Sequence, residues 1–201
     1  MNMLKIEQKH WKNHELVAGI DEAGRGPLAG PVVSACVIFK KNDFVEGIKD
    51  SKKLSEKKRN QLFDIIYEKA INVGVGIVHE NEIDNINILQ ATYLSMKIAI
   101  GNMDLKPDII LIDGPRSNIK HYKVEHIVNG DNLSQSIAAA SILAKVHRDQ
   151  MMVALASKYP GYGFERHKGY GTHMHYDMLM SLHPTPAHRH SFNPMALLSE
   201  I

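Results

Sequence analysis

The stretch LVAGIDEAGRGPLAGPVVSACVIF, residues 16–39, decides the fold of this chain. It holds two short runs rich in β-forming residues, Leu16–Ile20 and Val32–Phe39, on either side of the glycine-rich segment 23–31. Such runs predict strands, and the glycines and prolines between them predict a loop. Parallel strands need a longer crossover connection, so the short loop predicts an antiparallel pair.

Outward from this pair, strand patterns alternate with helical patterns. Further β-rich runs predict strands over 71–78, 108–112 and 124–128. Helical spacing and composition predict helices over 55–70, 80–100, 133–157 and 172–182. Strands interleaved with helices indicate an α/β fold, and the antiparallel first pair makes its sheet mixed.

Length and composition exclude several classes of protein. A chain of 201 residues favours one domain, with two small domains as the alternative, and 44% hydrophobic with 23% charged residues is ordinary for a globular protein. The apolar runs fall short of the roughly 20 residues of a membrane helix. No signal peptide is visible. A single cysteine, Cys36, which we expect to be buried in its strand, fits a reducing compartment, so we predict a cytoplasmic protein.

Four acidic residues follow predicted strands. Asp21 and Glu22 come after the first strand, Asp113 after the strand over 108–112, and Asp131 after the strand over 124–128. Each alone is compatible with a turn or a helix cap. Together, at the ends of neighbouring strands, they would repel one another unless a cation joins them, and Mg²⁺ and Mn²⁺ prefer carboxylate ligands. This pattern favours phosphoryl chemistry with one or two divalent metals.

Several motifs carry a resemblance to a known family. They are GIDEAGRGPLAGPVV at 19–33, DSKKL at 50–54, LIDGP at 111–115, SIAAASILAKVHRD at 136–149, HKGYGT at 167–172 and HRHSFNP at 188–194. In this order they resemble bacterial ribonuclease HII. The resemblance implies one catalytic domain over 1–201, with a ribonuclease H-like core over about 15–160, in which helices flank a mixed central sheet, and a helical carboxy-terminal extension over about 161–201. One departure is Leu182-His183-Pro184, where a glycine-proline pair is expected.

The resemblance also implies an activity. Members of this family cut the RNA strand of RNA–DNA hybrids and excise single ribonucleotides from duplex DNA, leaving a 5′-phosphate and a 3′-hydroxyl. Carried over by motif, the catalytic and metal-binding residues are Asp21, Glu22, Asp113 and Asp131. Two Mg²⁺ or Mn²⁺ ions are expected, one held by Asp21 with Asp113 or Asp131, and the other by Asp21, Glu22 and Asp113.

Two further motifs have a structural and a functional interpretation. Gly24-Arg25-Gly26 is compatible with a simple tight connection, or with a backbone that approaches a ligand closely while Arg25 binds phosphate. Tyr170, between two glycines, is either a core tyrosine or an exposed ring that stacks on a nucleotide. The resemblance implies that the tripeptide reads the RNA–DNA junction and that Tyr170 packs on the deoxyribose after the cut site.

A basic run over 49–59 is either a solvated face or a surface that contacts the nucleic-acid backbone. We expect Lys52 and Lys53 to bind substrate, together with Lys168. Four other basic or histidine side chains are expected to extend this surface: Lys145, Arg148, His167 and Arg189.

Three alternatives stay open at this point. Ribonuclease HIII is a sister family with an extra amino-terminal domain and without the Gly-Arg-Gly pattern. A hybrid-binding module without activity would not need all four acids, and a small-molecule phosphatase would not need the basic run or Tyr170. The HxH spacings near the carboxy terminus do not predict a transition-metal site, because helical ligand pairs lie four residues apart. No partner protein is indicated, and a monomer is the default expectation.

Overall fold

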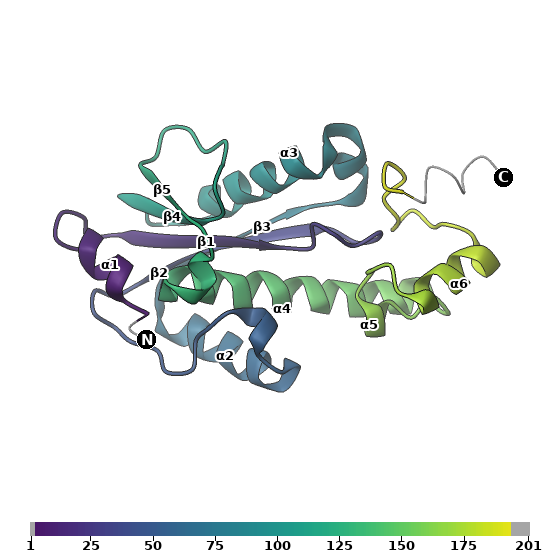
Figure 1. The fold of residues 1–201 in the computed structure, drawn as a ribbon, viewed down its shortest axis with the longest axis horizontal. Helices are drawn as coiled ribbons and strands as arrows, with labels where there is room; N and C mark the ends of the chain where they lie inside the picture. The colour runs from purple at the N-terminus through teal and green to yellow at the C-terminus, as the bar shows by residue number, and fades with distance from the viewer. Residues whose placement is uncertain (1–2, 194–201) are drawn as a thin grey trace.

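The computed structural model describes residues 3–193, which form a five-stranded sheet flanked by helices (Figure 1). The strands are β1 (Val17–Ala23), β2 (Val32–Phe39), β3 (Ala70–Val78), β4 (Ile109–Asp113) and β5 (Val124–Ile127), in the order β3-β2-β1-β4-β5. β2 runs antiparallel to both β1 and β3, whereas β1, β4 and β5 are parallel. The mixed sheet and the antiparallel first pair are therefore confirmed.

The helices are α1 (Lys5–His10), α2 (Glu56–Lys69), α3 (Glu80–Gly101), α4 (Gln135–Lys158), α5 (Phe164–His167) and α6 (His173–Leu182), with short 3₁₀ turns at Ser51–Lys53 and Gly130–Asn132. The four predicted helices are α2, α3, α4 and α6. The sequence analysis missed α1, α5 and the two turns, because such short elements show too little periodicity to be recognised.

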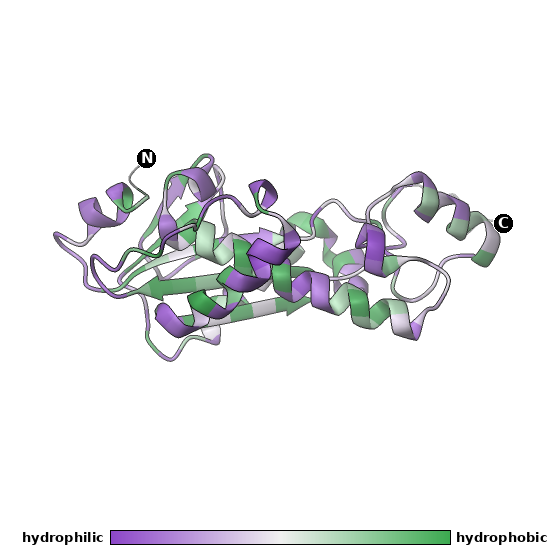
Figure 2. Ribbon diagram, turned by 90° about the horizontal axis from the view of Figure 1, so that it is seen from below, coloured by the Kyte–Doolittle hydropathy of each residue, from purple (hydrophilic) through white to green (hydrophobic). Residues whose placement is uncertain are grey.

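Helices cover both faces of the sheet, with α2 and α4 on one face and α3 on the other (Figure 1). In β2, Val37 and Phe39 pack in the cluster that contains α2 and α4, while Cys36 and Ile38 pack with α3. Because both faces are buried, the strand is apolar at nearly every position rather than alternating, and the central strands appear as continuous hydrophobic ribbons in Figure 2. Cys36 is buried as predicted.

Small residues let α4 lie directly on β1. A Cβ placed on Gly19 would be 2.2 Å from the backbone carbon of Ser136, closer than any real contact. The serine and alanine run at the start of α4 packs here without bulky side chains. This contact fixes the helix against the strand that carries Asp21 and Glu22.

The carboxy-terminal part lies at the far end of α4, beyond the sheet (Figure 1). Its core joins side chains of α5 and α6 to the loop after β1, with Leu28 and Ala29 packed in one cluster with Phe164 and Leu179. Residues 194–201, the end of the predicted extension, lie outside the described residues. Of the helices described, none combines the length and apolar character that crossing a membrane requires.

Six non-glycine residues among 3–193 have a positive φ, and Asn87 and His183 are two of them. Asn87, inside α3, has φ 66° and ψ 162° and divides the helix, and its side chain caps the second part through the amides of Leu89 and Gln90. His183, after α6, has φ 60° and ψ 163°. The position where the family pattern leads us to expect glycine is therefore one where the backbone favours glycine.

Candidate active site

Asp21 and Asp113 lie side by side at one edge of the sheet. The parallel register pairs Ile20 of β1 with Ile112 of β4, so the acids that follow occupy neighbouring positions. They open onto a pocket of about 580 Å³. Its lining includes eight of the predicted site residues, namely Asp21, Glu22, Gly24, Arg25, Gly26, Lys52, Asp113 and Tyr170.

The carboxylates in this pocket perturb one another. Burial raises the pKa of Asp21 well above its ordinary value, and the charges of Glu22 and Asp113 raise it further. Burial also raises the pKa of Glu22, although Arg25 opposes this shift through an ion pair of 3.2 Å between Nη1 and Oε1. Buried carboxylates without enough compensating charge are a site that a cation would stabilise.

Asp131 lies close to Asp113 but does not line this pocket. The amide of Gly130 donates to Asp113 Oδ1 at 2.6 Å, which places the turn that carries Asp131 beside the sheet edge. Burial raises the pKa of Asp131, with further contributions from Asp50 and Asp113. Asp50 is thus an additional acid near the site that the sequence analysis did not select. The position of Asp50 in the DSKKL motif at 50–54 could have identified it from the sequence.

The donor set fits a hard, hydrated cation. Among residues 3–193, no three acidic, histidine or cysteine side chains are arranged as a complete metal site. Mg²⁺ usually keeps several waters and binds through one or two carboxylates together with substrate phosphates. Asp21, Glu22 and Asp113 on an open pocket match this mode of binding better than an all-protein cage.

The substrate-reading residues of the prediction meet at the same pocket. Gly24 has φ 98°, and Gly26 is exposed. Tyr170 lies next to Gly26 with 45% of its surface exposed, as expected for a ring that is free to stack. Arg25 is exposed but is paired with Glu22 in this structure.

The predicted basic residues divide into groups with different surroundings. Lys52 and Lys145 line the pocket, next to a hydrogen bond of 3.0 Å between the hydroxyls of Ser51 and Ser141. Lys53 donates to Asn132 instead, beside Asp131. Lys168 does not line the pocket, and its Nζ donates to the carbonyl of Glu165 at 2.6 Å. The sequence analysis quoted the DSKKL motif but did not select Ser51, which lines the pocket.

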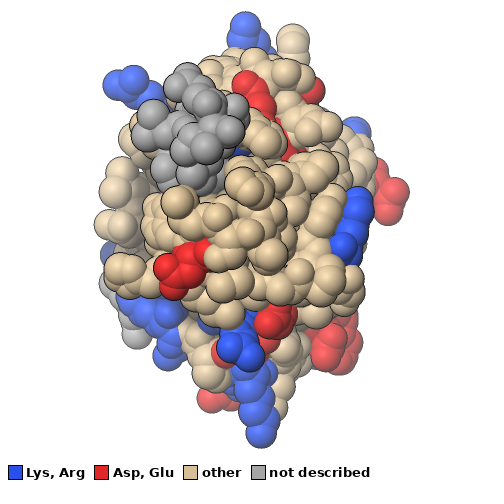
Figure 3. All heavy atoms as spheres, turned by 90° about the vertical axis from the view of Figure 1, so that its right-hand side faces the viewer, with Lys and Arg blue, Asp and Glu red and all other residues tan. Residues whose placement is uncertain are grey.

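The prediction that Arg148, His167 and Arg189 extend a basic surface is wrong. Both arginines are fully buried and His167 is 8% exposed. Their side chains donate to or accept from the backbone of the surrounding loops. The end of the molecule formed by the carboxy-terminal part also shows mainly uncharged side chains, with charged ones towards its rim (Figure 3).

A mixed sheet of this order, with carboxylates where β1 and β4 end, defines a nuclease of the ribonuclease H-like class. Within that class, the chain belongs to the ribonuclease HII family, whose family model matches residues 18–195. The family consists of divalent-metal-dependent endoribonucleases that hydrolyse the RNA strand of RNA–DNA hybrids.

Individual relatives agree with this assignment. The chain is 52% identical to the ribonuclease HII of Acetivibrio thermocellus over 92% of this chain and 73% of that one. It is 47% identical to that of Caldicellulosiruptor bescii over 95% and 93%. Among solved structures, ribonuclease H2 from Pyrococcus horikoshii aligns with a TM-score of 0.80 and 27% identity over 92% of this chain and 97% of that one. The ribonuclease HII of a PCNA complex from Archaeoglobus fulgidus aligns with a TM-score of 0.72 and 27% identity, covering 87% and 93%.

Proposed function

We propose that this enzyme cuts on the 5′ side of single ribonucleotides embedded in duplex DNA, in addition to hybrids, and leaves a 5′-phosphate and a 3′-hydroxyl. The observation that carries the proposal is that Gly24, Gly26 and Tyr170 line the same pocket as Asp21 and Glu22. Backbone without a Cβ can approach a 2′-hydroxyl closely, and this hydroxyl is what distinguishes RNA from DNA at one position.

The acids would hold Mg²⁺ or Mn²⁺ in this function, with Asp21, Glu22 and Asp113 as ligands and Asp131 supporting a second ion. Bound cations of this kind generate a nucleophile from water and stabilise charge on the leaving oxygen. The protein side chains supply the positioning. Lys52 lines the pocket beside the acids, where its ammonium group can contact substrate phosphates.

Tyr170 would supply the second half of the recognition. Its ring lies beside Gly26 in the pocket wall, with Cε1 3.9 Å from where a Cβ on Gly26 would stand. Packed on the sugar that follows the ribonucleotide, the ring would leave no space for another 2′-hydroxyl. The Gly24–Gly26 backbone and the Tyr170 ring together would therefore select a ribonucleotide followed by a deoxyribonucleotide. An aromatic ring that contacts a nucleotide typically contributes about 1–3 kcal/mol.

The test is cleavage of a duplex with one ribonucleotide, with Mg²⁺, with Mn²⁺ and with chelator, beside an all-DNA duplex. We expect one cut, 5′ of the ribonucleotide, that requires metal. A 2′-fluoro group at that nucleotide should suppress cleavage far more than binding. Cleavage of long hybrids without any cut at the single ribonucleotide would disprove the proposal and leave the family activity intact.

A further inference from the structure

Two buried arginines enclose the loop after β1 from different parts of the chain. Arg148 comes from α4 and Arg189 from the segment after α6, and each has no exposed surface. The loop between them, residues 24–31, carries the Gly24-Arg25-Gly26 backbone. Within residues 3–193 neither guanidinium forms an ion pair with a carboxylate.

Within the described part of the chain, the Arg189 side chain donates to backbone carbonyls of this loop alone. Its Nη2 bonds to Gly24 at 2.6 Å and to Gly30 at 2.7 Å, and its Nε also bonds to Gly30, at 2.9 Å. Its Nη1 bonds to Arg25 at 3.1 Å and to Pro27 at 2.8 Å. One rigid guanidinium therefore sets the positions of four carbonyls, including two in the tripeptide proposed to read the sugar.

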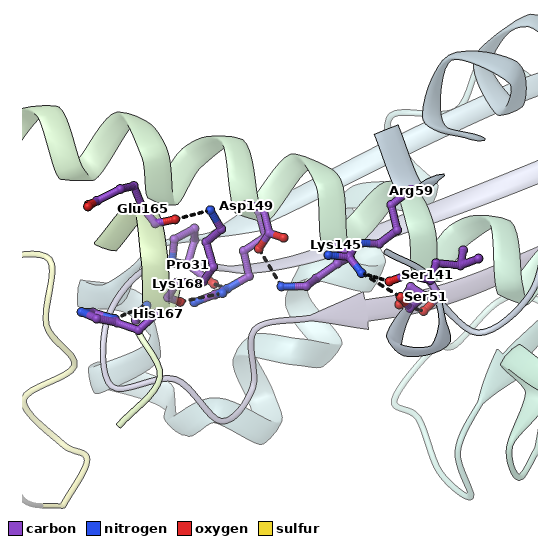
Figure 4. A network of polar contacts seen from close by, with 12 residues as sticks. Pro31, Ser51, Arg59, Ser141, Lys145, Asp149, Glu165, His167 and Lys168 are labelled. Carbon is purple, nitrogen blue, oxygen red and sulfur yellow. Dashed lines mark hydrogen bonds and ion pairs between the residues drawn. The ribbon is translucent and has the colours of Figure 1, made fainter. Parts of the chain in front are cut away.

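Arg148 joins this loop to the loop that carries Tyr170. Its Nε donates to Pro31 at 2.9 Å and its Nη2 to Ala29 at 3.0 Å. Its Nη1 donates to the carbonyl of Lys168 at 3.0 Å, and its Cζ lies 5.8 Å from the centre of the Tyr170 ring. Figure 4 shows Pro31, His167 and Lys168 gathered beside α4, further along the same helix from Ser141 and Lys145.

Burying these two guanidinium groups costs free energy, so stabilisation of the fold alone does not explain them. Burying a guanidinium without a carboxylate partner carries a desolvation cost, and burial lowers the pKa of Arg189 to about 9, which still leaves it charged at neutral pH. Apolar side chains would fill the space without that cost. What an apolar side chain lacks is a planar fork of donors that fixes carbonyls on separate segments.

The fit between the loop and Arg148 leaves no space. A Cβ placed on Gly24 would lie 2.1 Å from Arg148 Nε and 2.6 Å from the carbonyl oxygen of Pro31. The backbone at Gly24 is therefore held against the guanidinium rather than loosely tethered to it.

We infer that Arg148 and Arg189 are positioning residues that set the separation between the Gly24–Gly26 backbone and the Tyr170 ring, and thereby the preference for a single ribonucleotide over a continuous RNA tract. This inference rests on the proposed function. Neither arginine touches the substrate. Each acts through the loops that do.

The test compares two substrates in the full-length enzyme, a duplex with one ribonucleotide and an RNA–DNA hybrid of the same length. Arg148→Lys and Arg189→Lys keep the charge but lose the forked donor. We expect the ratio of kcat/KM on the single-ribonucleotide duplex to kcat/KM on the hybrid to fall by about tenfold or more, since misplacing reactive groups by about 1 Å can cost 100-fold. Ile66→Val, in the core cluster between α2 and the sheet, is the stability control.

The outcomes separate the two claims. An unchanged ratio in both variants, or a fall no larger than in the control after matching for thermal stability, would overturn the positioning role while leaving the proposed function in place. A wild-type enzyme that does not cut the single-ribonucleotide duplex would overturn both. If Arg189→Lys does not fold, Arg148→Lys decides the matter alone, because it tests the link to Tyr170 directly.

Discussion

The ring of Tyr170 lies beside Gly26 in the wall of the candidate active-site pocket. A Cβ placed on Gly26 would meet Tyr170 Cε1 at 3.9 Å, an ordinary van der Waals distance. A methyl group on Gly26 would therefore touch the ring without a clash, and Gly26 and the ring form neighbouring parts of the pocket wall. The proposed function places the sugar that is read against this part of the wall.

Gly26→Ala should accordingly separate stability from activity. We expect a melting temperature close to that of the wild type and a fall of about tenfold or more in kcat/KM on the single-ribonucleotide duplex, because the methyl group enters the sugar site. Gly24→Ala is the contrasting variant. Its Cβ collides with Arg148 and its φ of 98° is unfavourable, so it should lower stability as well. A fully active Gly26→Ala enzyme would show that no sugar binds against Gly26.

Asp21→Asn should abolish cleavage without weakening the fold. The carboxylate of Asp21 is buried near Glu22 and Asp113, so neutralising it removes repulsion, while an amide oxygen can still accept a hydrogen bond from the amide of Glu22. In chelator, we expect the free energy of unfolding in urea to rise by about 1 kcal/mol or more. Near-normal turnover would remove Asp21 from the metal site, and gross unfolding would make it structural.

Lys52→Ala should weaken hybrid binding and reduce the magnitude of its salt dependence. Lys52 lines the pocket beside the acids, and loss of one phosphate contact lowers the slope of log K against log salt by about 1. Lys53→Ala should have a smaller effect, because Lys53 Nζ is engaged by Asn132. Lys57→Ala, on the exposed side of α2, serves as the control for a solvated lysine. Equal slopes in all three variants would show that the basic run over 49–59 is a solvated face that does not contact the nucleic acid.

The two buried histidines of the carboxy-terminal part should contribute a loss of stability as the pH drops below about 6.5, the usual pKa of histidine. The raised pKa values of Asp21 and Glu22 act in the opposite direction, so the histidine contribution is obtained from the difference between the wild type and a histidine variant. His175 and His188 are buried with their Nε2 atoms 3.1 Å apart, and burial, followed by the charge of a neighbouring histidine, lowers each pKa to about 4. Between about pH 6.5 and 4, these two histidines therefore bind protons in the unfolded chain but not in the folded state. We expect a loss of roughly 1 kcal/mol for each histidine between pH 7.5 and 5.5, measured by urea unfolding. His188→Gln should flatten this dependence, and the exposed His173→Gln should not.

His183→Gly should raise stability. The present residue holds φ 60° and ψ 163°, a conformation that costs a non-glycine residue about 1–3 kcal/mol, and the added backbone entropy of glycine offsets only part of this. We expect a net gain of about 1 kcal/mol in the free energy of unfolding, with unchanged cleavage. His190→Gly, after the same helix at an exposed position of negative φ, is the matched control and should not stabilise the protein.

The sequence by itself determined the sheet and the acids at its edge. The short link between Val17–Ala23 and Val32–Phe39 required an antiparallel pair, and the apolar runs placed the strands correctly to within a few residues. The sequence analysis placed both acids just after strands, whereas Asp21 lies within β1 and Asp113 is the last residue of β4. The parallel register of β1 and β4 still brings the two acids to one edge of the sheet. These features depend on local patterns and on chain connectivity, both of which a sequence states directly.

Only the tertiary structure decided the roles of the buried polar side chains. On a helix or in a loop, Arg148 and Arg189 have the local pattern of surface residues. Their carbonyl partners in the loop after β1 are nevertheless 117 to 165 positions away in the chain. His175 and His188 meet across 13 residues in the same way. Whether a charged or titratable side chain can be buried depends on which acceptors the fold brings to it, and no local pattern records that.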